Sequence, residues 1–234
     1  ARAASAPVDR ISALAAKHAD GAMLLDIPAD SSHPEPIVLD LVGVGREPVT
    51  WGQVLIDVGA GAKATVVLRF SGAAQYAGNL SVVVGDNASL ELVSVQNWSD
   101  DSVHAGHFAT RIGRDARLRS VLVTLGGEAV RLVQTVDYDG PGGDADIRGL
   151  FFADAGQRFE HRSFVDHSQP HCRSNVVFKG ALQGERARSV WVGDVLIRAN
   201  AVGTQTYEIN RNLLLDDGPR ADSVPNLEIG RAHV

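Results

Sequence analysis

The sequence is poor in cysteine and in long apolar runs, and each shortage excludes a class of protein. Cys172 is the single cysteine among 234 residues, so the chain can form neither an internal disulfide framework nor a closed metal site made of cysteines alone. No apolar run reaches the roughly 18 residues that a membrane-spanning helix needs, and the first ten residues lack the apolar stretch of a signal peptide. We therefore expect a cytoplasmic protein from a reducing compartment, with no membrane partner.

The charge balance and the nucleotide motifs exclude two further classes. The formal net charge is -6, which argues against nucleic acid as a partner. No phosphate-binding G-x-x-x-x-G-K-[ST] loop is present, so any ATP must be bound by another chain. The glycine-rich stretch at residues 59–64, GAGAKA, resembles a dinucleotide fingerprint, but a strand-like run follows it where that motif needs a helix. We interpret the stretch as a turn.

The residue pattern predicts one short helix followed by many strands. Asp9 can cap a helix, apolar residues follow it at helical spacing, and Gly21 ends the pattern. Beyond it, β-branched and apolar runs are bounded by Gly, Pro, Asp and Asn, and almost no long helical pattern occurs, which argues against an alternating α/β fold. The predicted strands cover residues 22–27, 36–42, 53–58, 65–70, 80–84, 89–95, 117–125 and 130–138.

A short phrase recurs along the strand-rich part of the chain. It consists of glycine, two further residues, alanine, a polar residue and an apolar one, and a repeat of this kind indicates stacked coils of strands and turns. The first three copies lie 26 and 28 residues apart, whereas the last interval is 42 residues, so a coil there is longer or out of alignment. The aligned alanines are Ala62, Ala88, Ala116, Ala145 and Ala187.

This repetition predicts a parallel β-helix, that is, a solenoid. Propeller blades need about 40 residues in four antiparallel strands, so a propeller fits less well, and a β-sandwich stays compatible with the strand spacing alone. We predict an N-terminal helical segment at residues 1–20 and a β-helix core domain at residues 21–234. The two ends of such a stack must be capped or used for assembly.

Cysteine and histidine stand together in one stretch, residues 164–175, FVDHSQPHCRSN. His167, His171 and Cys172 could meet across the turn at Pro170, which makes them candidate metal ligands. A cysteine beside a histidine could also be a nucleophile with its base, but no oxyanion-hole pattern accompanies the pair. His161 shares the strand face of His167. The two lie about 20 Å apart along a strand, too far to bind one metal. The third interpretation is a structural turn, in which the polar residues have no chemical role.

A β-helix that acts on carbohydrate is the alternative from a different functional class. Glycoside cleavage uses two carboxylates, and pairs of acids occur at residues 100–101, 137/139, 144/146 and 216–217. All lie in turn-like contexts, where solvated acids are common. The alternative predicts a lateral cleft lined by carboxylates and arginines.

The last third of the chain resembles the SufB/SufD family of iron–sulfur cluster assembly proteins, and within it the SufD-like members. The resemblance rests on the H-x-x-P-H-C-x-S turn with its K-G in residues 166–182, the V-G-D-V-x-I segment at 192–197, the N-x-N-L-L-L run at 210–215 and the P-N-L-E-I ending at 225–229. Earlier strands match more loosely, so the resemblance covers about residues 20–229.

The resemblance implies a right-handed parallel β-helix with a scaffold role and no enzymatic activity. It implies two partners, a SufB-like paralogue that pairs through the β-helices and a SufC-type ABC ATPase that docks on C-terminal helices. A nascent iron–sulfur cluster is expected at the interface with the paralogue and not in the isolated chain, and a homodimer is expected when the chain is alone. A SufB-like subunit or a homodimeric scaffold is the nearer alternative.

The sequence departs from the family after Ile229. The family continues with an interface histidine, the F-Y-L-x-S-R-G-I motif and docking helices, whereas this sequence continues with Gly-Arg-Ala-His-Val. The helical segment is therefore expected for the family but absent from this chain. His233 is the candidate counterpart of the interface histidine and joins Cys172, His171 and His167 as a candidate for contact with metal.

Overall fold

The computed structural model describes residues 6–230 and has one helix and thirteen strands within them. The predicted parallel β-helix with a short N-terminal helix is confirmed, because almost every strand pairs in parallel with the strand one coil away. Among the described residues, no helix is long and apolar enough to span a membrane. The elements are α1 (Arg10–His18), β1 (Met23–Ile27), β2 (Ile37–Val58), β3 (Lys63–Val84), β4 (Ser89–Trp98), β5 (Val103–Ile112), β6 (Arg117–Thr124), β7 (Ala129–Tyr138), β8 (Asp144–Ala153), β9 (Arg158–His167), β10 (Arg173–Leu182), β11 (Arg188–Ile197), β12 (Gln205–Leu214) and β13 (Arg220–Ile229).

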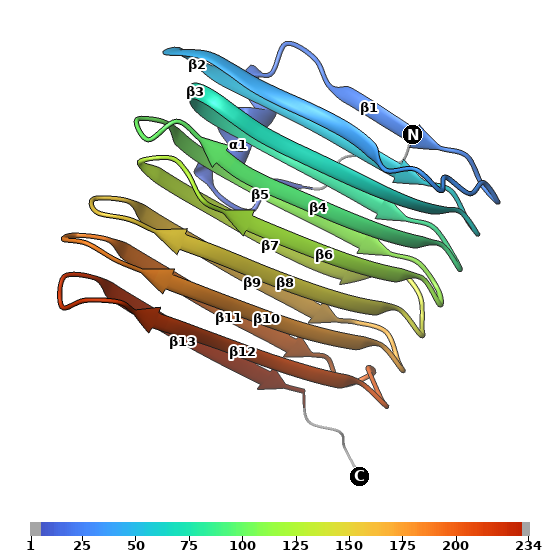
Figure 1. Ribbon diagram of the computed structural model, residues 1–234. Coiled ribbons are helices and arrows are strands. Elements are labelled where there is room, and N and C mark those ends of the chain that lie inside the picture. The colour runs from blue at the N-terminus through green and yellow to red at the C-terminus, as the bar shows by residue number, and fades with distance from the viewer. Residues whose placement is uncertain (1–5, 231–234) are drawn as a thin grey trace.

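The coils are flattened, so that the strands form two layers (Figure 1). Strand order is β12-β10-β8-β6-β4-β3-β5-β7-β9-β11-β13. The even layer contains β4, β6, β8, β10, β12 and the first half of β3, and the odd layer contains β5, β7, β9, β11, β13 and the second half of β3. Each coil contributes one strand to each layer, and a tight turn joins them.

Two pairs of predicted strands are continuous in the structure. Residues 36–42 and 53–58 both belong to β2, and residues 65–70 and 80–84 both belong to β3, because these two strands pass from one layer to the other without a turn. The bend is possible because small residues occupy it. A Cβ at Gly43 would approach the carbonyl oxygen of Ala73 to 2.4 Å, and Gly72 has a φ of 78°, a left-handed conformation that favours glycine.

The turn that enters the even layer repeats with one small residue in a fixed place. Strand register aligns the residue just before each even-layer strand, and we call this set the turn column. The residue preceding each member has a left-handed φ between 54° and 76°, which turns the chain back toward the stack. The turn column consists of Ala62, Ala88, Ala116, Gly143, Cys172 and Thr204.

The predicted repeat is right for three of its five alanines and wrong for two. Ala62, Ala88 and Ala116 occupy the turn column. Ala145 lies two residues inside β8, opposite Leu118, and Ala187 precedes an odd-layer strand at the other turn of its coil. A glycine-to-alanine phrase therefore marks both kinds of turn, which the phrase by itself could not distinguish.

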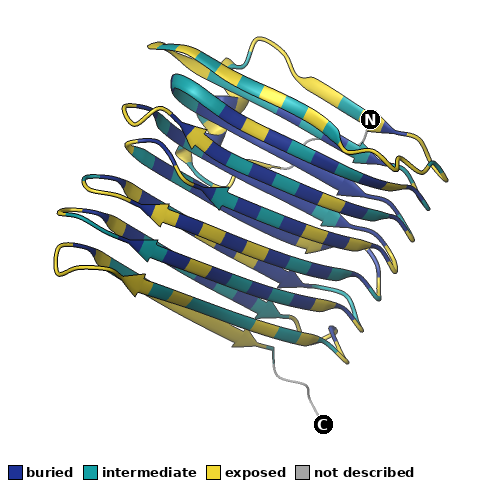
Figure 2. Ribbon diagram, in the orientation of Figure 1, coloured by how far each residue is buried: buried dark blue, intermediate teal, exposed yellow. Residues whose placement is uncertain are grey.

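Alternate side chains of every strand point into the space between the layers and form the core. Figure 2 shows this as bands of buried residues that alternate with half-buried ones along the central strands. The largest fully buried side chains include Phe151, Phe159, Phe178 and Trp191, and burial of each such side chain contributes about 2–3 kcal/mol. The core therefore runs along the axis of the solenoid from the first coils as far as β11.

Helix α1 packs on the outside of the odd layer. Asp9 accepts a hydrogen bond from the Ser12 backbone at 2.8 Å, as the sequence predicts for a cap, and Ser12 and Ala15 are buried. The Asn79 side chain of β3 donates to the Ser12 carbonyl at 2.9 Å, and Arg131 of β7 contacts Asp9 at 2.6 Å. The helix thus covers the first coils. The domain boundary proposed from the sequence at residue 20 stays a prediction.

Candidate functional site

Cys172 lies in the turn column and is fully buried. Its thiol lies 3.6 Å from the carbonyl oxygens of Gly140 and Pro170. Burial raises the pKa of the Cys172 thiol above its usual value and outweighs the opposing effect of hydrogen bonds from the Gly143 and Gly142 backbones. Since the thiolate is both the nucleophile and the metal ligand, these surroundings favour the structural interpretation of Cys172.

His171 is an exposed turn residue whose contribution comes from its backbone. Its φ of 59° matches the left-handed residue that precedes the turn column in the other coils, and its N–H donates to the Val202 carbonyl at 2.8 Å. The imidazole lies over the next turn, where a Cβ at Gly203 would come within 2.5 Å of Nδ1. Histidine tolerates this backbone conformation better than most residues with side chains.

His167 points into the core. Its Nε2 lies 2.9 Å from the Ser174 hydroxyl, which in turn lies 2.7 Å from that of Thr206, and its ring stacks on Tyr138. Burial lowers the pKa of His167 to about 4 against the opposing charge of Asp166. His161 is also buried, on the same strand face as predicted, with Nε2 3.0 Å from the Thr124 hydroxyl. Both rings are neutral near pH 7 and connect polar groups of the core.

The candidate ligands do not converge. Cys172 is buried in a turn, His171 is exposed and His167 faces the core, and within residues 6–230 no three His, Cys, Asp or Glu side chains gather closely enough to hold a metal ion. His233 lies outside the described residues, so its proposed role stays a prediction. The stretch that first suggested a metal site is therefore a turn of the solenoid.

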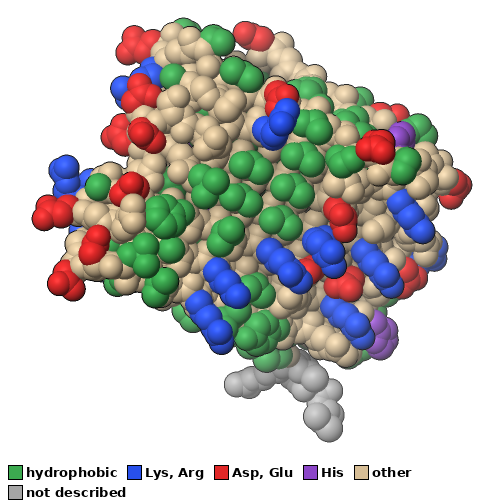
Figure 3. All heavy atoms as spheres, in the orientation of Figure 1, with side chains coloured by type: hydrophobic (Ala, Val, Ile, Leu, Met, Phe, Trp, Pro, Cys, Tyr) green, Lys and Arg blue, Asp and Glu red, His purple; other side chains and the backbone are tan. Residues whose placement is uncertain are grey.

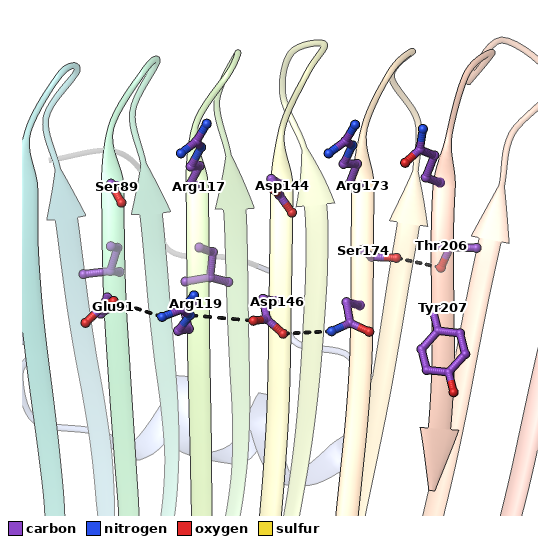
Figure 4. Close-up of a pocket in the computed structure, with 14 residues that line it drawn as sticks. Ser89, Glu91, Arg117, Arg119, Asp144, Asp146, Arg173, Ser174, Thr206 and Tyr207 are labelled. Carbon is purple, nitrogen blue, oxygen red and sulfur yellow. Dashed lines mark hydrogen bonds and ion pairs between the residues drawn. The ribbon is translucent and has the colours of Figure 1, made fainter.

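A charged groove of about 580 Å³ crosses the even layer near its turns (Figure 4). Arg119 of β6 lies 3.4 Å from Glu91 and 3.6 Å from Asp146, and the Asn175 side chain donates to Asp146 at 3.1 Å. Arg148 also contacts Asp146, at 2.9 Å. The contacts of Glu91, Arg119, Asp146 and Asn175 link one strand to the next along a single row, as cross-strand charge pairs do on ordinary sheets, whereas Arg148 lies on the same strand as Asp146.

This groove is the lateral cleft that the carbohydrate alternative predicts. The carboxylate of the groove with the most contacts is Asp146, whose oxygens already contact Arg119, Arg148 and Asn175. A glycosidase needs one carboxyl that can give up a proton and a second that is free to attack or to activate water. Asp146 is held by three side chains and is not free to attack or to activate water, so the groove by itself gives that alternative little support.

The last coil ends the core with polar side chains, a feature that the sequence analysis missed. Thr206, Glu208, Asn210 and Asn212 of β12 lie in register with core positions of β10, and Ser223 of β13 donates to Asn210 at 2.6 Å. Burial raises the pKa of Glu208 to about 7, and the charge of Asp194 adds to the effect. Figure 2 shows that this coil is more exposed than those in the middle of the stack.

The signal for this polar coil lay in the alternation of residues 206–212. Every second residue there is polar, whereas the aligned positions of β10 are Ser174, Val176, Phe178 and Gly180. Recognising the difference requires the coil register, which the sequence did not supply. The exposed apolar residues of the last coil are Tyr207, Leu213, Leu214, Leu215, Val224, Leu227 and Ile229.

The fold and these sites together describe a solenoid that offers surfaces and, within residues 6–230, no assembled metal site. Comparison with protein families identifies it. Residues 42–234 match the model described as "SUF system FeS cluster assembly, SufBD core domain". The chain therefore belongs to the SufBD family of iron–sulfur cluster assembly proteins, as its resemblance predicted.

Individual relatives agree with this assignment. The chain is 48% identical over 229 residues to an iron–sulfur cluster assembly SufBD family protein of Mycobacterium bovis, with 95% of this chain and 58% of the relative covered. The corresponding protein of Mycobacterium leprae is 45% identical over the same shares. Escherichia coli SufD is 25% identical over 178 residues, which are 74% of this chain and 42% of SufD. The chain thus spans little more than half the length of the first two relatives.

Proposed function

We propose that this chain is part of a non-catalytic scaffold subunit that assembles iron–sulfur clusters together with a SufB-like paralogue and a SufC-type ABC ATPase. The observation that carries the proposal is the match of residues 42–234 to the SufBD core. The absence of a phosphate-binding loop from the sequence is consistent with an ATPase on a separate chain. The nascent cluster is the cargo of this complex, and the complex acts in the cytoplasm.

The last coil is the surface that best suits pairing with the paralogue. β12 and β13 are each paired on one side only among the described strands, and Leu227 and Ile229 are 57% and 64% exposed. Sheets commonly associate through free strand edges and exposed apolar side chains. We infer from the same surface that the isolated chain forms a homodimer, because a second copy offers an equivalent edge.

The cluster in this proposal is held between subunits and not by this chain alone. The Cys172 thiol is buried and its pKa is raised, and His167 Nε2 lies at hydrogen-bond distance from the Ser174 hydroxyl. Liganding residues would come from the paralogue and from the segment around His233. This arrangement predicts that the isolated chain purifies without iron.

Co-purification tests the proposal. The whole polypeptide is co-expressed with its SufB-like and SufC-type partners and isolated through a tag on this subunit, and we expect a complex of all three. Leu227→Asp with Ile229→Asp should remove the paralogue, because two charges then lie on the pairing surface. Val38→Asp, at an exposed site of β2 in the first coils, is the matched control. Recovery of this subunit alone from unmutated cells would refute the proposal.

A further inference from the structure

The outer surface of the even layer carries an uncovered band of apolar side chains, which we call the even face. Strand register places Val67, Val93, Val121 and Val177 in one row across the layer, with Arg148 of β8 between the last two. A parallel row contains Val95, Val123 and Leu150, followed by Lys179 and Arg211. Figure 3 looks onto this face and shows hydrophobic side chains gathered across its middle, with a band of lysines and arginines, interspersed with some acidic side chains, beside them.

The even face is hollowed where its apolar and basic parts meet. A hollow of about 400 Å³ is lined by Val121, Leu150 and Val177 together with Arg148 and Lys179. Leu150 is 53% exposed. An apolar floor beside two cations is suited to a large apolar side chain that has a carboxylate close by.

Two cations of the even face are available for a partner, Lys179 at the hollow and Arg211 next to it in register. Arg148 contacts Asp146, but no carboxylate in the described part of the chain pairs with Lys179 or Arg211, which are neighbours in register. On the odd layer, a helix of the chain itself covers a comparable surface. There, α1 covers apolar residues, and Asp9 beside that helix contacts Arg131 of the sheet at 2.6 Å.

We propose that the even face docks an amphipathic helix of a partner protein, with an apolar stripe that lies on the valine rows and acidic residues that pair with Lys179, Arg211 and Arg148. Charge complementarity argues for an acidic helix. It argues against a second copy of this chain in a two-fold dimer, because Lys179 and Arg211 would then face either their own copies or Arg69, the cation at the other end of the same row. The even face reaches β12 of the last coil through Arg211. Its apolar rows lie on the earlier strands, and the proposal uses neither Leu227 nor Ile229, so it does not depend on the pairing proposed above.

A pair of synthetic peptides tests the proposal on the purified chain. Both have eighteen residues and a leucine stripe, and one has glutamates and the other lysines along the flank. Fluorescence anisotropy should show binding of the glutamate peptide only. Lys179→Glu with Arg211→Glu should weaken this binding about ten-fold or more and improve binding of the lysine peptide, since two charge pairs are reversed.

A matched variant on the other layer separates a specific surface from general charge. Arg158→Glu with Arg188→Glu changes two exposed odd-layer cations that are also neighbours in register, and it should leave the affinity of the glutamate peptide unchanged. Val121→Asp should abolish binding through the apolar rows. Circular dichroism of each variant verifies that the fold is retained.

Four results would overturn the proposal. The first is failure of the glutamate peptide to bind, and the second is equal loss of affinity in both charge-reversal variants. The third is a fall in solution mass on Val121→Asp, because the even face would then join two copies of this chain. The fourth is binding to vesicles rich in phosphatidylglycerol, lost in the Lys179 and Arg211 variant, while the glutamate peptide stays unbound, because the surface would then be specific for anionic lipid.

Discussion

The two outer faces of this solenoid are built from the same coils yet meet different surroundings. On the odd layer, residues such as His107, Ala109 and Val133 are buried, and α1 packs beside them. On the even layer, the aligned valines stay half-exposed, and Lys179 at the hollow pairs with no carboxylate of the described residues. Strand register alone therefore does not decide whether an outward position is core or surface. What covers the sheet decides it.

Acidification is expected to have the largest effect, and it tests whether the two faces are parts of one cooperative unit. His161 and His167 lie between the layers with pKa values lowered to about 4 from 6.5 by burial. The unfolded chain binds these protons near pH 6.5 and the folded chain does not, so stability falls as pH drops from about 6.5 to about 4, by up to ~3 kcal/mol for each ring.

Urea unfolding at about pH 7 and about pH 4.5 measures this loss. His161→Phe should flatten the pH dependence, whereas His33→Gln, which changes an exposed histidine, should not. If α1 separates at a higher pH than the strands unfold, the two faces are independent and the comparison fails.

A charge beneath α1 should destabilise the covered face strongly. Ala15 is fully buried against the odd layer, whereas Ala13, on the same helix, is exposed. Ala15→Glu should lower the free energy of unfolding by about 3 kcal/mol, because it buries an unpaired carboxylate. Ala13→Glu should change it by less than about 0.5 kcal/mol. Equal effects in denaturant titrations would show that the helix contact is not stabilising.

The contact between Asp9 and the sheet should have a moderate effect. Asp9→Ala removes the cap to Ser12 and the ion pair to Arg131, which together predict a loss of about 1–2 kcal/mol. Burial acts to raise the pKa of Asp9, but hydrogen bonds from Ser12 and Arg131 outweigh it and hold the pKa below 3.8. The stabilisation is therefore present above pH 3.8 and is lost as pH falls below it.

Asp20→Ala serves as the control for this prediction, since Asp20 is an exposed acid beyond the end of the helix. The thermal unfolding midpoints of the unmutated chain and of Asp9→Ala should differ above pH 3.8 and converge below it. A constant difference across that range would mean that the carboxylate charge has no part in docking.

The same substitution, valine to threonine, made on both faces tests the comparison with a smaller expected change in stability. Val133 is 8% exposed on the odd layer and Val121 is half-exposed on the even layer. Val133→Thr should cost about 1–2 kcal/mol because it buries a hydroxyl, and Val121→Thr should stay within about 0.5 kcal/mol. Equal costs in chemical denaturation would mean that the even face is as well covered as the odd face.

The smallest effect is expected at the turn that joins the two layers. Cys172→Ala places in the turn column the residue that three other coils already have there, and the predicted cost is below about 1 kcal/mol. In cells, Cys172→Ser should impair cluster assembly less than removal of the interface histidine that the family resemblance implies, for which His233 is the candidate. Complete loss of iron–sulfur proteins in the Cys172→Ser strain would assign the thiol a chemical role.

The periodicity of the sequence predicted the fold correctly, whereas the candidate site was predicted less well. The repeat of glycine and alanine predicted stacked coils, because tight turns need small residues at fixed places. The same phrase misplaced Ala145 and Ala187, since both turns of a coil use similar residues. His167, His171 and Cys172 are neighbours in sequence, but a strand end and a left-handed turn separate their side chains.

The sequence by itself determined the β-helix, its N-terminal helix with the Asp9 cap, and the family, because these depend on local turns, alternation and motif order. Only the tertiary structure decided which outward residues are covered, where the polar last coil lies, and that Cys172 is a member of the turn column. The physical reason is that burial and unpaired charge depend on coils about 30 residues apart in the chain, and their register is set only when they stack.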